Sequence, residues 1–351
     1  MINLLKNGKC IIALGCLTLT GMLAGCGSTG EKTAEGMQQV QELNYKEALA
    51  SFDAASEAGE NARLIARGQG IAYMGMTDYE NAIACFEEAL RASDGFVESV
   101  DYDLSYYLAA AYVKNGQLTE AEAVYDAILA LKSDEKDAYF LRGSVRLEQN
   151  NYEGAKADFD QVVSRDAGNY DRLIEIYQAL EHYGYREVGR EYLNNAMGTA
   201  GDKMNNYDSG RMYYYLGEYQ QACVALEKSR EKGDADSYLY LGKAYEATGD
   251  YNYASSVYNS WLTKDTSSAA IYNQLGLCEM AMGNYKQALE AFQAGMQIEN
   301  NSLMQTLAFN EVVAYEYLED YQKARVLVDN YLNNYPDDEQ AKREQQFLST
   351  R

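Results

Sequence analysis

Apolar residues recur at helical spacing in two short segments of residues 235–266, and a turn separates the two segments. The apolar and small positions are Tyr238, Leu241, Gly242 and Tyr245 in the first segment, and Tyr251, Ala254, Tyr258 and Trp261 in the second. Thr248, Gly249 and Asp250 form the turn, because glycine next to small polar residues favours a chain reversal. The stretch therefore predicts a helical hairpin.

The same pattern repeats along the chain, and the small residue near the start of each second segment measures the repeat. We call it the marker residue, and the markers are Ala48, Ala82, Ala121, Ala155, Val188, Ala222, Ala254, Ala288 and Ala324. Successive markers lie 34, 39, 34, 33, 34, 32, 34 and 36 residues apart. A near-constant period of this length predicts a repeat array rather than two globular domains.

Bulky residues flank the marker at fixed distances. A tyrosine lies three residues before it at Tyr45, Tyr79, Tyr152, Tyr185, Tyr219, Tyr251, Tyr285 and Tyr321, and Leu118 replaces it once. A larger side chain lies four residues after it at Phe52, Phe86, Tyr125, Phe159, Tyr192, Leu226, Tyr258, Phe292 and Val328. We expect the small residue to let the two helices approach and the bulky residues to fill the space beside them.

The order of residues in 235–266 is aromatic, Leu-Gly, Tyr, Gly, Tyr, Ala and aromatic, which resembles the tetratricopeptide repeat. The resemblance implies an all-α fold, a right-handed superhelical solenoid of about nine hairpins over residues 35–337. Residues 338–351 predict a more polar capping helix, with Ala341, Phe347 and Leu348 on its apolar side.

Three features depart from the regular pattern. The step of 39 residues adds about five residues near 93–97, which predicts a longer loop. The fifth hairpin, residues 169–197, lacks the Leu-Gly pair and has Val188 as its marker. The Gly-Thr-Ala-Gly run at 198–201 could bend the array, and whether it is a hinge is left open. Pro336 is the only proline, so the ends of the other hairpins are less sharply marked.

The N-terminus has the features of an export signal. A weakly basic start is followed by an apolar run over residues 10–23 and then by Leu23, Ala24, Gly25 and Cys26. The run is too short for a stable membrane span, so we expect residues 1–25 to be a cleaved signal peptide. An uncleaved anchor followed by a chance cysteine is the alternative.

The four residues that end this segment resemble the bacterial lipobox. The resemblance implies that the Cys26 thiol is acylated, by palmitate for example, and becomes the first residue of a lipoprotein. Residues 26–34 would then be a lipidated tether. Such a protein lies on the extracytoplasmic face of a bacterial membrane, in the cell envelope, without a transmembrane helix. Which membrane carries it is left open.

The charge of the chain limits its partners. The 351 residues carry a net charge of −23, and removal of residues 1–25, with Lys6 and Lys9, makes it −25. Such a charge argues against nucleic acid or an anionic lipid surface as the main partner of the folded body. A solvated acidic surface is the simpler interpretation, and binding of a basic partner is the alternative.

The inventory of reactive residues is small. Beyond the N-terminal segment, Cys85, Cys223 and Cys278 lie on apolar stretches of different hairpins, so we expect core packing and no disulfide framework. The only histidine is His182, and no cluster with metal-ligand spacing accompanies it. No phosphate loop or nucleophile motif occurs. We expect no enzyme activity, no cofactor and no metal.

Binding is the remaining chemistry. The resemblance implies that the first helices of the hairpins line a concave groove. Candidate groove residues are Arg67, Tyr106, Lys114, Phe140, Tyr177, Tyr207, Arg211, Tyr214, Lys243, Asn273 and Phe309. Aromatic rings with a few cations suit an extended acidic or mixed peptide. Several tyrosines could instead belong to the core, whereas Arg211 and Lys243 favour the groove because long cationic side chains resist burial.

Within the resembled family, the clamp that binds chaperone C-termini uses a set of Lys, Asn and Arg residues that this chain does not supply, so we do not predict it. The sequence favours a membrane-anchored adaptor that binds a protein or peptide partner. Glycan binding through tyrosine faces is the first alternative, although no insertion longer than about five residues is present to build a sugar site. An enzyme, or an accessory subunit of one, is the second.

Overall fold

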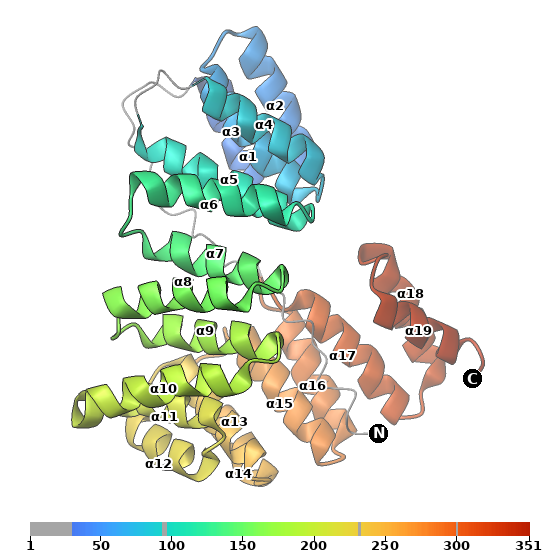
Figure 1. Cartoon of the computed structure of the whole chain (residues 1–351). Coiled ribbons are helices and arrows are strands. Elements are labelled where there is room, and N and C mark those ends of the chain that lie inside the picture. Colours follow the sequence, from blue (N-terminus) through green and yellow to red (C-terminus); the bar gives the residue numbers. More distant parts are fainter. Residues whose placement is uncertain (1–29, 93–96, 231–232, 300) are drawn as a thin grey trace. The chain divides into compact units, whose positions relative to one another are not determined.

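A computed structural model describes residues 30–92, 97–230, 233–299 and 301–351, and these residues form helices joined by short turns (Figure 1). By their contacts the residues separate into two compact units, Met1–Tyr192 and Leu193–Arg351, and each unit is described by itself. The signal peptide predicted at 1–25, Cys26 and residues 93–96 of the predicted longer loop lie outside the described residues.

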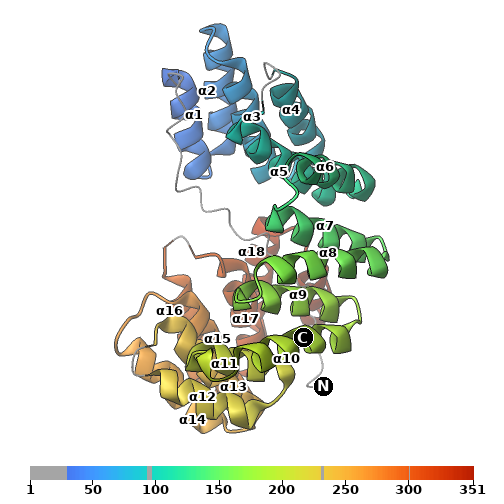
Figure 2. The same cartoon turned by 60° about the vertical axis from the view of Figure 1, so that its left-hand side comes forward.

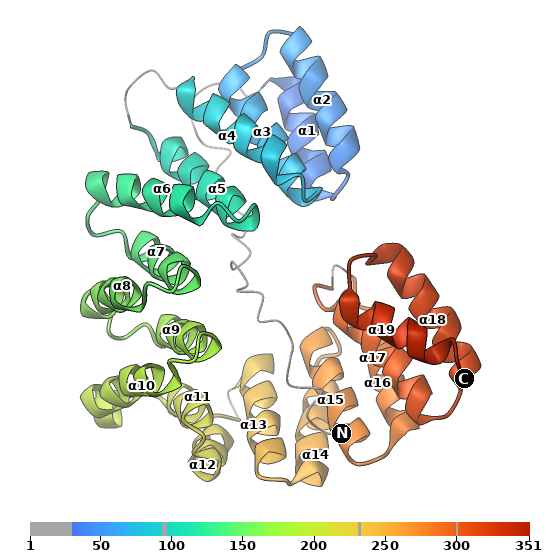
Figure 3. The same cartoon turned by 45° about the vertical axis from the view of Figure 1, so that its right-hand side comes forward.

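The first unit contains helices α1 to α9 and the beginning of α10. Their bounds are α1 Glu31–Gln41, α2 Tyr45–Glu57, α3 Ala62–Gly75, α4 Tyr79–Arg91, α5 Ser99–Lys114, α6 Leu118–Leu131, α7 Lys136–Glu148, α8 Tyr152–Arg165, α9 Tyr170–His182 and α10 Arg186–Ala200. Because α1 begins at Glu31, residues 31–34 of the predicted tether are already helical. Figure 3 shows α5, α7 and α9 along one side of this unit, with α6 and α8 along the other.

The second unit contains the end of α10, a 3-10 turn and helices α11 to α19, and Figure 2 labels α11 to α18. Their bounds are η2 Gly201–Lys203, α11 Asn206–Leu216, α12 Tyr219–Ser229, α13 Ala235–Ala247, α14 Tyr251–Leu262, α15 Ala269–Ala281, α16 Tyr285–Met296, α17 Met304–Tyr317, α18 Tyr321–Asn334 and α19 Glu339–Leu348. The described helices thus pair into nine hairpins followed by a final helix, which confirms the predicted all-α hairpin array.

The core of most hairpins is built from one small residue on the first helix and one large residue sixteen positions later on the second. A Cβ atom added at Gly70 would lie 2.5 Å from the Phe86 ring, and one at Gly242 would lie 2.2 Å from the Tyr258 ring. The rings of Phe86 and Tyr258 are fully buried. Because glycine has no side chain, the ring of the second helix can pack directly against the backbone of the first.

The alanine markers confirm the close approach from the other side. Every alanine of the marker series is completely buried. The tyrosine three residues before most markers is the first residue of the second helix, as at Tyr45, Tyr79 and Tyr251. The ring at this position packs near the turn, for example Tyr152 on Tyr185 with ring centroids 4.2 Å apart.

The structure corrects the marker of the fifth hairpin by one residue. Each turn within a hairpin has one residue with positive φ, and it lies five residues before the marker in the other eight hairpins. In the fifth hairpin this residue is Gly184, which makes Gly189 the marker instead of Val188. Gly189 is buried, and Leu193, four residues later, is fully buried. Tyr192, which the sequence placed in this role, instead donates a hydrogen bond of 2.6 Å to Asp160.

The capping helix α19 packs against α18, with Ala341 and Leu348 completely buried. Phe347, predicted on the apolar side, is 41% exposed, and the Arg351 guanidinium lies 4.7 Å from its ring centroid. Helix α19 also places the carboxyl group of Glu344 near that of Glu316 on α17. Burial, and then the proximity of the Glu344 carboxyl group, raise the pKa of Glu316 to about 8.

The first prediction concerns the turns. Thr77, with φ of 60°, holds a left-handed conformation that costs a non-glycine residue about 1 kcal/mol or more, and its side chain is exposed. We expect Thr77→Gly to raise the urea midpoint of unfolding, although the more flexible unfolded chain offsets part of the gain. The matched variant Gly249→Ala, at a turn with φ of 86°, should lower the midpoint. A change of both midpoints in the same direction would contradict this account.

The second prediction concerns the capping helix. A carboxyl group whose pKa is raised by folding stabilises the fold below its unfolded pKa of 4.5, and this contribution is lost as pH rises through about 8. We expect Glu316→Gln to reduce the fall in melting temperature between pH 5 and pH 9, because the amide stays neutral. Glu290→Gln, at an exposed position of α16, is the control and should leave the fall unchanged. Equal pH profiles for wild type and Glu316→Gln would show that the pair does not control the stability of the cap.

Candidate functional site

Within each unit the first helices of successive hairpins contact one another, as α1 does with α3, α7 with α9, α11 with α13, and α13 with α15. Successive second helices make at most marginal contact with each other in the described residues. The hairpins are therefore closer together on the first-helix side, which makes that side the inner one in each unit. This is the side on which the sequence predicted a binding surface.

In the first unit one of the two predicted groove cations, Arg67, is neutralised by an acid of a neighbouring helix. Arg67 donates a hydrogen bond of 2.7 Å to Asp103 and lies 5.6 Å from the centre of the Tyr107 ring. Lys114 is exposed at the end of α5. Tyr106 is half-buried, with its ring centroid 6.3 Å from that of Tyr125.

Arg142 and Arg146, on the first helix α7, show the same neutralisation. Arg142 binds both oxygens of Asp158, at 2.6 and 3.0 Å, and Arg146 binds one of them at 2.8 Å. The Asp158 carboxylate is only 3% exposed, so the three groups form a buried network that ties α7 to α8. These charges are held within the unit and offer little to a ligand.

Two predicted groove residues of the first unit belong to the core instead. Phe140 is 6% exposed, with the Arg172 guanidinium 4.2 Å from its ring centroid. Tyr177 is 1% exposed because it occupies the first-helix position that is glycine in most hairpins. Here the second helix supplies the small residue, since a Cβ at Gly189 would lie 3.0 Å from the Tyr177 ring. The prediction that Phe140 and Tyr177 line a groove was therefore wrong.

In the second unit the predicted residues Tyr207, Arg211 and Tyr214 come together on α11. The Arg211 guanidinium lies 4.3 Å from the Tyr207 ring centre and donates a hydrogen bond of 2.6 Å to Asp208. Arg211 is 8% exposed, which corrects the expectation that it resists burial. Stacking on aromatic rings and a carboxylate partner together allow a guanidinium to be buried.

Tyr240 on α13 joins this cluster, although it is not among the groove residues predicted from the sequence. Its ring centroid lies 6.3 Å from that of Tyr207 and 5.9 Å from that of Tyr214, and both pairs meet edge to face. Its hydroxyl is 3.1 Å from that of Tyr215. Tyr240 lies two residues before the glycine of its first helix, so counting from Gly242 would have placed it on this face.

Lys243, one turn along α13, lies with its amino group 5.7 Å from the centre of the Tyr240 ring. The side chain is half-buried, and this burial lowers the pKa of the Lys243 amino group despite the opposing charges of Glu246 and Asp236. Burial likewise raises the pKa of Glu246, whose carboxylate accepts hydrogen bonds from Tyr258 and, at 2.9 Å, from Gln274 on α15.

Amide side chains continue the surface over α15 and α17. Asn310 donates a hydrogen bond of 2.8 Å to the predicted groove residue Asn273. Phe309, also predicted, is half-buried with its ring centroid 5.5 Å from that of Tyr331 on α18. We call the surface formed by these neighbours the tyrosine–amide face, and it consists of Tyr207, Tyr214, Tyr240, Asn273, Gln274 and Asn310, together with Lys243.

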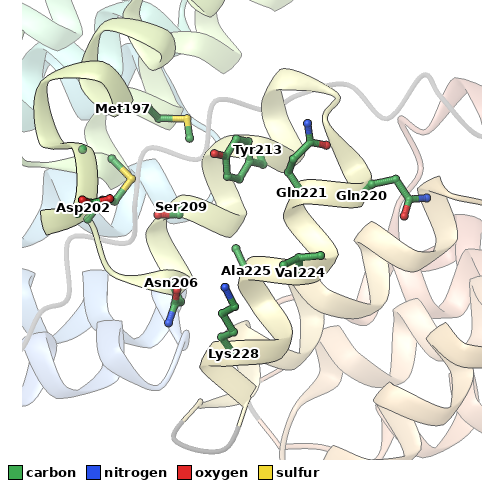
Figure 4. Close-up of a pocket in the computed structure, with 12 residues that line it drawn as sticks. Met197, Asp202, Asn206, Ser209, Tyr213, Gln220, Gln221, Val224, Ala225 and Lys228 are labelled. Atoms are coloured by element: carbon green, nitrogen blue, oxygen red, sulfur yellow. The ribbon is translucent and has the colours of Figure 1, made fainter.

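A hollow of about 720 Å³ lies elsewhere in the second unit, between the end of α10, η2, α11 and α12 (Figure 4). Met197 and Asp202 lie on one side of it, and Tyr213, Gln221 and Val224 on the other. A Cβ atom added at Gly201, which lines the hollow, would have no atom within 4 Å. The space beside this glycine is therefore open. The hollow shares no residue with the tyrosine–amide face.

Other reactive side chains show no convergent arrangement in the described residues. His182 is exposed and meets the Tyr183 ring edge-on at 4.9 Å. No group of three or more His, Cys, Asp or Glu residues there has the geometry to hold a metal ion. Burial raises the pKa of Cys85 and Cys223 to about 11 and that of Cys278 to about 12. None of the helices in the described ranges is long and apolar enough to cross a membrane.

Comparison with known proteins agrees with this architecture. Sequence profiles of the tetratricopeptide repeat match residues 33–95, 67–138, 113–172 and 269–302. The chain is 24% identical over 203 residues to RNA polymerase II-associated protein 3 of Xenopus laevis, a match that covers 58% of this chain and 28% of that protein. It is 24% identical over 267 residues to intraflagellar transport protein 70A of Danio rerio, covering 75% of this chain and 39% of that one. The chain thus spans well under half the length of these relatives.

Among solved structures, that of yeast Tom70 superposes with a TM-score of 0.51 at 12% identity, over 91% of this chain and 87% of that one. At this identity the similarity shows the fold alone.

Proposed function

Because the chain is a tetratricopeptide repeat protein, we propose that it is a non-enzymatic adaptor that binds a peptide segment of a protein partner along the tyrosine–amide face. The observation that carries the proposal is the continuity of this face. Side chains of α11, α13, α15 and α17 meet across each helix-to-helix boundary, from Tyr207 and Tyr240 through Gln274 to Asn310.

The chemistry of the face suits an extended peptide. Half-buried tyrosine rings give apolar contact area and few degrees of freedom to lose on binding. Each amide side chain has two donors and one acceptor oxygen. In the described residues the Asn273 oxygen is used and its amino group is not, while Asn310 uses only its amino group. These remaining groups can pair with the N–H and C=O groups of a peptide backbone.

The first unit is the weaker candidate for this role. Most of its first-helix cations are held in internal ion pairs, such as Arg142 and Arg146 with Asp158, and Arg67 with Asp103. A ligand there would have to break buried ion pairs, which is strongly destabilising. We therefore assign peptide binding to the second unit.

We propose further that the adaptor is held on the extracytoplasmic face of a bacterial membrane through a lipid on Cys26. The support is the sequence: a short apolar run followed by Leu23, Ala24, Gly25 and Cys26 resembles a lipoprotein signal. Helix α1 begins at Glu31, so few residues separate the lipidated cysteine from the folded body. An adaptor with so short a tether would present its partner close to the membrane surface.

The third prediction tests the binding face in cells. A photo-crosslinking amino acid at Leu277, on the first helix α15 and half-buried, should capture a discrete partner, because this position lies one turn from Asn273 and Gln274. The matched position is Val326 on the second helix α18, which is 52% exposed and should give no such product. Capture from Val326 and not from Leu277 would contradict the proposal. A product that contains polysaccharide instead of protein would favour glycan binding.

The fourth prediction tests the anchor. Labelled palmitate supplied to cells should enter the wild-type chain and be absent from Cys26→Ala, because only this cysteine is placed for acylation by the signal. Cys85→Ala is the control, since Cys85 is a half-buried residue of α4. Undiminished label in Cys26→Ala would refute the lipoprotein assignment, and the peptide-binding proposal would be unaffected.

A further inference from the structure

Lys243 differs from the other basic residues of the described chain in how its charge is satisfied. Most of its half-buried or buried counterparts have a carboxylate partner, as Arg67 has Asp103 and Arg211 has Asp208. Lys114 and Lys228, for which the described residues show no carboxylate partner, are exposed to water. Among the described residues, Lys243 alone is half-buried with neither an ion pair within 4.0 Å nor a hydrogen bond.

The neighbours of Lys243 do not offset the free-energy cost of partly burying its charged amino group. Glu246 and Asp236 act on it only at a distance, since no salt bridge joins either of them to it in the described residues. The Glu246 carboxylate is already held by Tyr258 and Gln274. Loss of hydration therefore lowers the pKa of Lys243, which means that the charged amino group is destabilised in the free protein. Groups in this state are typical of binding sites, where a ligand supplies the missing partner.

We propose that Lys243 binds the side-chain carboxylate of an Asp or Glu residue within the peptide that the tyrosine–amide face accommodates. This inference rests on the proposed function and adds the residue type that the site selects. A carboxylate would accept hydrogen bonds from the ammonium group, and the Tyr240 ring beside it excludes water from the pair.

The position of Lys243 within the face favours a side-chain carboxylate over a chain terminus. The face extends past Lys243 on both sides, to Tyr207 on α11 and to Asn273 and Asn310 on α15 and α17. A peptide that covers the whole face thus continues in both directions from the residue opposite Lys243. Its carboxylate must then come from a side chain.

The net charge of −23 does not conflict with an acidic ligand residue. Long-range repulsion slows association and weakens with salt, whereas a short-range pair in a partly dehydrated site determines which sequence binds. One carboxylate opposite one unpaired cation is favourable, and further acidic residues in the ligand would meet an acidic surface. The site is therefore expected to select a single acidic residue in a mainly apolar or polar segment.

The fifth prediction uses three pools of fluorescent decapeptides with Glu, Gln or Lys at the central position and uncharged residues elsewhere. The full chain should bind the Glu pool about tenfold more tightly than the Gln pool, and the Lys pool least, because a charge-assisted hydrogen bond in a half-buried site has about this value. Lys243→Met should bind the Glu and Gln pools equally. Lys228→Met, which removes an exposed lysine of α12, should keep the wild-type preference.

The outcomes separate this inference from the proposed function. Equal binding of all three pools by the wild type would overturn the role of Lys243 and leave peptide binding intact. Binding of none of them would overturn both. A preference for Glu that persists in Lys243→Met would place the carboxylate elsewhere and refute the inference.

A second measurement distinguishes a binding role from a structural one. A lysine whose burial is uncompensated destabilises the free protein, so Lys243→Met should raise its melting temperature by a few degrees. A structural lysine would give a lower melting temperature on the same substitution. A fall would therefore contradict the proposal even if the peptide preference were lost.

Discussion

The close approach of two helices at a residue without a side chain governs this structure. At Gly70 and Gly242 the first helix leaves room for a ring from the second, and a Cβ atom would collide with Phe86 or Tyr258. The third and ninth hairpins divide the same volume differently between their two helices. The third pairs Ala109 with Tyr125, and the ninth pairs Val312 with Val328. Because protein interiors are close-packed, a larger side chain on one helix requires a smaller one at the paired position of the other helix. The repeat is thus a rule about paired volumes rather than about particular residues.

This constraint also decides which side chains can serve a ligand. Where the first helix carries a large residue at the small position, as at Tyr177, that residue is used for the core and is lost to the surface. Where glycine occupies the position, as at Gly242, the residues around it, Tyr240 and Lys243, are left on the inner side. The second unit keeps a surface of half-buried rings and amides on its first helices, while the first uses its cations in internal ion pairs such as Arg142 with Asp158.

Much of the fold could be predicted from the sequence because the packing rule has a fixed spacing. The marker alanines located eight of the nine hairpins, and Ala341 and Leu348 located the cap. The fifth hairpin was shifted by one residue, since Tyr185 precedes the helix there instead of beginning it. For the proposed binding face, the register indicated the first-helix side, but the burial of Arg211 could not be predicted. That burial depends on the Tyr207 ring and the Asp208 carboxylate, and only the structure shows that both lie against the guanidinium.

The two units thus differ in how their first-helix charges are satisfied. We assign peptide binding to the first-helix side of the second unit. Hydrogen–deuterium exchange of the full chain, with and without the tightest-binding Glu-centred decapeptide, tests this assignment most directly. The account predicts that the peptide slows exchange in α11, α13 and α15 and leaves α12, α14 and α16 unchanged. Slower exchange confined to the second helices, or to the first unit, would contradict it.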